Sequence, residues 1–151
     1  MRLRPPLVFL LALFTLGVAL GAVAGQPLTL LHFNDFHGQL EPYPDRDTGK
    51  PIGGIARLAG LVEAIRAEDP GRPVLLLFAG DLLQGTTTST LYLGRPDIKL
   101  LEEMGVAAAT VGNHEVDFGQ DNLRKLAGMV NFPLLAANLS ATPEPLPLPS
   151  F

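Results

Sequence analysis

Three apolar segments of the chain each end in residues whose side chains bind metal ions or transfer protons. The candidate residues are Asp35, His37, Asp81, Asn113, His114 and Asp117. Carboxylate oxygens, amide oxygens and imidazole nitrogens suit divalent ions such as Mn²⁺, Zn²⁺, Fe²⁺, Mg²⁺ or Ca²⁺. Loops at strand ends carry chemistry because a rigid scaffold positions them. The sequence therefore predicts a metal-dependent site.

The first two candidates, Asp35 and His37, are two residues apart. Residues at this spacing lie on the same side of an extended chain, so both side chains can reach one ion. Asp81, after the second apolar segment, is interpreted as a carboxylate that bridges two ions. Two ions about 3.5–4 Å apart activate water at neutral pH and hold a phosphoryl group during in-line attack.

His114 and Asp117 form a separate pair with a different predicted role. Residues three apart at the start of a helix share a face, so Asp117 can orient the imidazole of His114. His114 could then protonate a leaving alkoxide as a general acid. Taken alone, the stretch 111–119 could also be an ordinary polar turn. Three strand ends of the same character favour a site.

The positioning elements follow from hydrophobic periodicity. Residues 74–78 are five consecutive apolar residues, a pattern typical of a strand buried on both faces. His32 lies inside the first strand and is predicted to be a core histidine or one that supports a ligand. Alternating strands and helices indicate a layered α/β fold. The expected strands are 28–33, 74–78, 107–111 and 132–136, and the expected helices are 55–68, 97–104 and 120–130, with 41–54 as a polar loop.

The first 24 residues are predicted to be a signal peptide. Arg2 and Arg4 precede the uncharged apolar run 7–23, and Ala22-Val23-Ala24 supplies a cleavage site after Ala24. A retained membrane anchor is the alternative, because the run is near the lower limit for a spanning helix. Cleavage predicts a periplasmic or secreted protein without a membrane partner.

Charge and composition narrow the function further. Without Arg2 and Arg4, nine Lys and Arg remain against 15 Asp and Glu, so the net charge of the exported part is −6. Such an acidic domain is poorly suited to binding nucleic acid, because the phosphate backbone is also negatively charged. An anionic substrate would need bound metal ions to attract it. The absence of cysteine excludes disulfides and thiolate zinc sites within the sequence.

The ordered motifs Asp35-x-His37, Gly80-Asp81 and 112–115 (Gly-Asn-His-Glu) resemble those of the calcineurin-like metallophosphoesterases. The longer strings 32–38 and 112–119 are similar to the exported 5′-nucleotidase branch. That branch includes UDP-sugar hydrolase/5′-nucleotidase and 2′,3′-cyclic-nucleotide 2′-phosphodiesterase. The resemblance implies a four-layer α/β/β/α sandwich, two divalent metal ions, and a small phosphate ester, in particular a nucleotide, as substrate.

The same resemblance assigns roles to individual residues. It implies that Asp35 and His37 bind the first metal, that Asp81 bridges, and that Asn113 binds the second metal. It implies that His114 and Asp117 form the dyad that contacts phosphate and assists the leaving group.

The chain departs from the family pattern in one respect. The family takes further histidine ligands from two later motifs, whereas none of the three histidines here follows His114. The chain therefore resembles the N-terminal portion of such an enzyme, with 25–140 belonging to the phosphoesterase domain and 141–151 a Pro-rich loop or truncated end. The alternatives are a related exported hydrolase, such as a thiosulfohydrolase, or a catalytically incomplete domain that binds metal or a partner.

Overall fold

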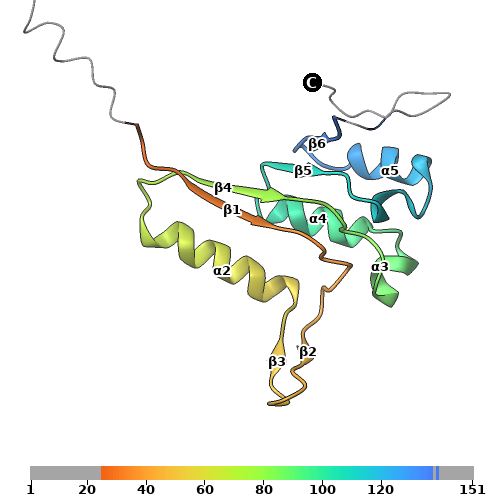
Figure 1. Ribbon diagram of the computed structural model, residues 1–151, viewed down its shortest axis with the longest axis horizontal. Coiled ribbons are helices and arrows are strands. Elements are labelled where there is room, and N and C mark those ends of the chain that lie inside the picture. Colours follow the sequence, from red (N-terminus) through yellow and green to blue (C-terminus); the bar gives the residue numbers. More distant parts are fainter. Residues whose placement is uncertain (1–24, 138, 140–151) are drawn as a thin grey trace, which may run out of the picture.

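A computed structural model describes residues 25–137 and 139. The predicted signal peptide and the Pro-rich stretch 141–151 lie outside the described residues. The centre of the fold is a four-stranded parallel sheet with strand order β1-β4-β5-β6 (Figure 1). Its strands are β1 (Thr29–Phe33), β4 (Val74–Phe78), β5 (Ala108–Thr110) and β6 (Leu134–Leu135).

Three helices connect consecutive strands of this sheet: α2 (Ile55–Glu68), α4 (Arg95–Glu103) and α5 (Gln120–Ala127). Connections between parallel strands are right-handed in nearly all proteins. Since the strand order follows the chain order in one direction, all three helices are placed on the same face of the sheet. Figure 1 shows α2 running alongside β1 and β4.

The covered face of the sheet forms the core with these helices. Leu76 and Phe78 of β4 are each 2% exposed, and they belong to one buried cluster with residues from all three helices. These helix residues include Val62, Leu101 and Leu123. The predicted bounds of α2 and of β4 are confirmed. The fold class, α/β with a parallel sheet, is confirmed as well.

The opposite face of the sheet is open within the described residues. Leu30 is 55% exposed, and His32 beside it is exposed too. A groove of about 290 Å³ runs over this face, lined among others by Leu30, His32, Leu77 and Thr110. Within the described residues His32 is exposed and not in the core as predicted, because alternation in β1 turns its side chain away from the helices. Its predicted role in supporting a ligand stays a prediction. Burial of β4 on both faces is likewise absent from the described part of the chain.

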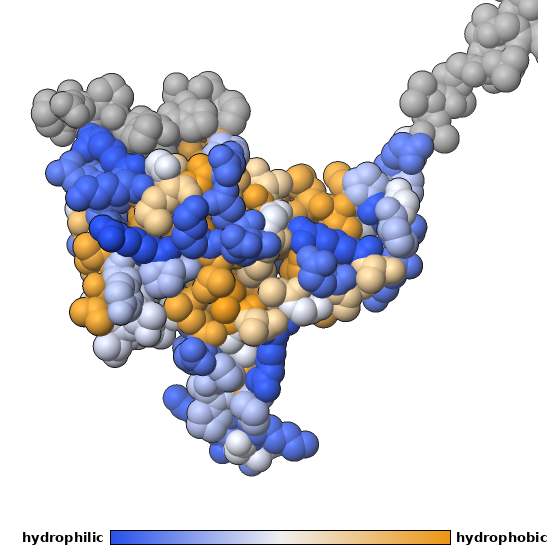
Figure 2. All heavy atoms as spheres, turned by 180° about the vertical axis from the view of Figure 1, so that it is seen from behind, coloured by the Kyte–Doolittle hydropathy of each residue, from blue (hydrophilic) through white to orange (hydrophobic). Residues whose placement is uncertain are grey.

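Outside the loops of the candidate site, two short elements were not predicted. Residues 41–54, expected to be a loop, contain an antiparallel hairpin of β2 (Tyr43–Pro44) and β3 (Pro51–Ile52). Its turn is held by Asp45, whose Oδ1 accepts a hydrogen bond from the Thr48 amide at 2.8 Å. The hairpin projects from the body and is mainly polar, whereas apolar side chains reach the surface of the body (Figure 2). The second element is α3 (Thr87–Leu91).

The helices and strands otherwise differ from prediction only at their ends. Helix α4 begins at Arg95 rather than Asp97, with Gly94 as its N-cap. Helix α5 stops at Ala127, where Gly128 caps it. No helix within residues 25–137 and 139 has both the length and the apolar character needed to span a membrane.

Candidate metal centre

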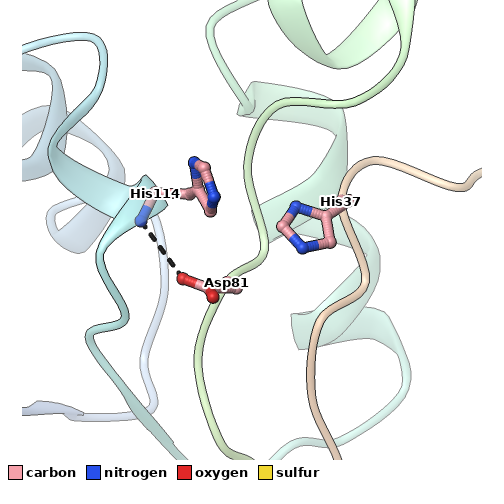
Figure 3. Close-up of side chains that lie close together, drawn as sticks. All are labelled: His37, Asp81 and His114. Atoms are coloured by element: carbon pink, nitrogen blue, oxygen red, sulfur yellow. Dashed lines mark hydrogen bonds between the residues drawn. The ribbon is translucent and has the colours of Figure 1, made fainter.

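The carboxyl ends of β1, β4 and β5 bring three of the predicted residues together. One ligand atom each from His37, Asp81 and His114 lies within 4.8 Å of the others. Figure 3 shows the three side chains converging from three separate segments of the chain. Parallel strands release their following loops at the same edge of a sheet, which is why residues distant in sequence meet here.

The loops that carry these residues adopt an uncommon backbone conformation. Asp35, His37 and Asp81 have positive φ angles of 51°, 48° and 61°. Residues other than glycine rarely occupy this left-handed region, and such residues cluster at functional sites. The Asp35 amide donates to the Gly80 carbonyl at 3.0 Å, and the His37 amide donates to the Asp81 carbonyl at 3.2 Å. These bonds fix the two loops to one another.

Asp81 and His114 are connected directly. The His114 backbone N–H donates to Asp81 Oδ1 at 3.1 Å, the contact dashed in Figure 3. The ring of His37 lies edge-on to that of His114, with 5.0 Å between the centroids. Nδ1 of His37 lies 3.4 Å from the Leu83 carbonyl, so a proton on Nδ1 leaves Nε2 as the ligand atom.

The other two predicted ligands lie beside this cluster. Asp35 Oδ1 is 3.7 Å from His37 Nε2, and the Asp35 side chain is 58% exposed. Asn113 is exposed directly before His114. The structure therefore gathers His37 and Asp81, as expected for ligands. It adds His114, for which the sequence predicted an acid–base role instead.

The predicted dyad lies on a short 3-10 helix, η1 (His114–Val116), which Asp117 follows. His114 Nδ1 is 2.7 Å from Asp117 Oδ2, and both side chains are 30% exposed. The hydrogen bond that His114 donates to the Asp117 carboxylate raises the pKa of His114 above its ordinary value of 6.5. The negative charges of Asp117, Asp81 and Glu115 act in the same direction, while desolvation opposes them. This geometry suits an imidazolium that donates a proton.

Glu115 is a residue to which sequence analysis gave no role. Its side chain is buried, and its carboxylate accepts hydrogen bonds from three backbone amides at the ends of β4 and β5. Residue spacing carries no signal for such a role, because the partners are main-chain groups. Only its position inside the motif 112–115 drew attention to it.

The donor set fits a divalent metal ion. The imidazole of His37 and the carboxylate of Asp81 suit a borderline ion such as Zn²⁺, Mn²⁺ or Fe²⁺. The imidazole of His114 lies close enough to act as a third ligand, but only while it is not protonated. Several positions in such a shell would remain for water or substrate, as in catalytic metal sites. The neighbouring Asp35 carboxylate, 3.7 Å from His37 Nε2, would offer a further oxygen ligand.

Known proteins are similar to this chain in both sequence and fold. A 5'-nucleotidase of Bos taurus is 42% identical over 135 residues, which are 82% of this chain and 23% of that protein. The crystal structure of a 5'-nucleotidase precursor from Thermus thermophilus matches with a TM-score of 0.71 and 36% identity. That match covers 78% of this chain and 23% of the other.

A third relative is the NAD nucleotidase of Haemophilus influenzae. Its structure matches with a TM-score of 0.70 and 31% identity, over 80% of this chain and 22% of that one. The chain thus spans about a quarter of the length of these relatives. Residues 28–148, most of the chain, match the calcineurin-like phosphoesterase family. The chain therefore belongs to the calcineurin-like phosphoesterase family, within which it is similar to the 5'-nucleotidase branch.

Proposed function

We propose that this chain takes part in the divalent-metal-dependent hydrolysis of phosphate monoesters, with nucleotides as substrates, in an exported enzyme. The observation that carries the proposal is the convergence of His37, Asp81 and His114, whose ligand atoms lie within 4.8 Å of one another. Similarity to 5'-nucleotidases and to a NAD nucleotidase supports nucleotides as the substrate class.

In this proposal Asp35, His37, Asp81 and Asn113 hold two divalent ions. Ions bound there would polarise the phosphoryl group and make water a nucleophile at neutral pH. His114 donates a proton to the leaving alkoxide. Asp117 keeps Nδ1 of His114 protonated through the 2.7 Å contact, so that the other ring nitrogen faces the reacting group.

We further propose that the full fold is a four-layer α/β/β/α sandwich. The open face of the sheet supports this, because Leu30 and Leu77 line an apolar groove there. Monomeric proteins rarely leave a large apolar surface uncovered. A second sheet packed on this face would bury β4 on both sides, as its apolar sequence predicts.

The test is phosphate release from AMP by the full chain with Mn²⁺, with and without a chelator, compared with Asp81→Asn. Asparagine tolerates the left-handed backbone at this position, so the variant removes charge without changing the loop. We expect turnover to fall at least about a hundredfold. Asp47→Asn, in the exposed hairpin turn, is the control.

Two other results are informative. Equal turnover by wild type and Asp81→Asn would contradict the proposed chemistry. Mn²⁺ binding without turnover would instead favour a domain that binds metal but is catalytically incomplete. Fractionation of the producing cells tests export, because the processed chain should be recovered outside the cytoplasm.

A further inference from the structure

Glu115 lies between the two loops that carry Asp81 and His114. Its side chain is only 5% exposed. Oε2 accepts hydrogen bonds from the amides of Gly112 at 2.6 Å and Asp81 at 3.1 Å, and Oε1 accepts one from Leu82 at 2.5 Å. One carboxylate therefore connects the backbone after β4 with the backbone after β5.

The chemistry of these contacts requires a carboxylate. An ionised carboxylate only accepts hydrogen bonds, whereas the amide of glutamine places an NH₂ group where one of its oxygens stood. That NH₂ would face at least one of the three backbone N–H groups. Bonds from N–H groups to an ionised acceptor are also roughly twice as strong as neutral ones.

Glycine at position 112 allows the two loops to approach each other closely, because it has no side chain. A Cβ atom at Gly112 would lie 2.8 Å from Glu115 Oε2 and would collide with Asp81. The two loops are therefore in direct contact. Glu115 satisfies the amides that this contact buries, which would otherwise lack partners.

We propose that Glu115 is a positioning residue that fixes Asp81 relative to His114. The Glu115 carboxylate is bonded to the Asp81 amide, while the Asp81 carboxylate accepts from the His114 amide at 3.1 Å. Together these bonds close a loop of contacts that spans both strand ends. Residues that orient metal ligands contribute about 10–100-fold to metal affinity. The predicted effect on metal affinity rests on the proposed function. The hydrogen bonds by which Glu115 joins the two loops, called the clamp below, do not depend on it.

Two variants of Glu115 separate the effect of its negative charge from the effect of where its carboxylate lies. Glu115→Gln keeps the shape and removes the charge, while Glu115→Asp keeps the charge but is one methylene too short to span the loops. Val62→Ala, on the buried face of α2, controls for general destabilisation. Glu103→Gln, an exposed acid on α4, controls for loss of one negative charge.

The first measurement is amide hydrogen exchange of the full chain without metal. In both Glu115 variants the amides of Asp81, Leu82 and Gly112 should exchange at least tenfold faster than in wild type, while amides of β4 keep their rates. Val62→Ala should leave the three loop amides unchanged relative to β4. Wild-type exchange at these amides in both variants would overturn the clamp.

The second measurement is Mn²⁺ titration of the same proteins. Both Glu115 variants should bind Mn²⁺ about 10–100-fold more weakly, and both controls should stay within about twofold of wild type. Wild-type affinity in Glu115→Asp would overturn the positioning role, because charge alone would then suffice. A wild-type chain that binds no Mn²⁺ overturns the proposed function, and amide exchange then decides the clamp by itself.

Discussion

Two buried carboxylates, in different regions of the molecule, have opposite surroundings. Glu115, between β5 and α5, is 5% exposed and accepts three backbone hydrogen bonds. Asp97, in the first turn of α4, is fully buried, and neither of its oxygens has a hydrogen-bond partner among the described residues. Burial alone therefore says little about what an acid does. Its partners decide whether the charge holds structure together or weakens it.

The surroundings of Asp97 explain its titration. Burial raises the pKa of its carboxyl group above the ordinary value of 3.8, and the neighbouring Ser89 offsets only part of this effect. The Ser89 hydroxyl is itself buried, and its position relative to the Asp97 carboxylate does not meet the geometry of a hydrogen bond. Ser89 also lies against Gly38, the residue after His37, so it is close to one of the loops that form the site.

The largest effect is expected for Glu115→Ala. The substitution leaves three buried N–H groups without their acceptor, and each such loss costs about 1–3 kcal/mol. We expect the free energy of unfolding, measured by urea titration, to fall by about 3 kcal/mol or more. Glu103→Ala on the surface should change it by less than about 0.5 kcal/mol. Equal stability of the two variants would remove the distinction between Glu115 and an ordinary acid.

Asp97→Asn should have a smaller effect of opposite sign. Because the folded state binds its proton more tightly than the unfolded state, the stability of the wild type should fall as the pH rises from 3.8 through the raised pKa. At pH 7 the neutral variant should be more stable than the wild type, because it carries no buried charge without a partner. Thermal unfolding from pH 3 to pH 7 measures this. A variant less stable than wild type at pH 7 would mean that the charge of Asp97 is compensated.

Asp117, whose side chain contacts His114, stands between Glu115 with three hydrogen bonds and Asp97 with none among the described residues. Of the three substitutions, Asp117→Asn should change the free energy of unfolding least. Protonated His114 stabilises the fold below pH 6.5, and this contribution is lost as the pH rises through the raised pKa. The variant should lower the pKa of His114, as measured by NMR titration of the imidazole. Asp121→Asn, an exposed acid near the start of α5, should not change it. An unchanged pKa in Asp117→Asn would contradict the dyad.

Sequence patterns predicted the elements that hydrophobic periodicity controls. The bounds of α2 were correct because its apolar stripe runs without interruption until Pro70, and β4 was correct because its apolar run is sharply bounded. Helix α3 was missed because its Thr-rich sequence has no apolar repeat. The hairpin strands β2 and β3 were missed because two residues each are too few to show alternation.

The site was predictable in its residue types but not in its geometry. The meeting of His37 with Asp81 follows from the rule that ligands gather at the carboxyl ends of parallel strands. The proximity of His114 to both depends on the turn of η1 and on positive φ angles at residues other than glycine, which no spacing reveals. The role of Glu115 could not be predicted from the sequence either, because its hydrogen-bond donors are main-chain groups.

The strand order of the sheet has a consequence for folding kinetics. Each of β4, β5 and β6 pairs with the strand that precedes it in the parallel sheet, so no later strand has to insert between earlier ones. Each pairing still joins residues that are far apart in sequence, such as Thr29 with Val74 and Leu77 with Ala108, so the sheet forms through non-local contacts, which slow folding. The sheet can grow by one strand and one helix at a time as the chain emerges. The metal-binding edge would be completed only when β5 and the loop after it have docked.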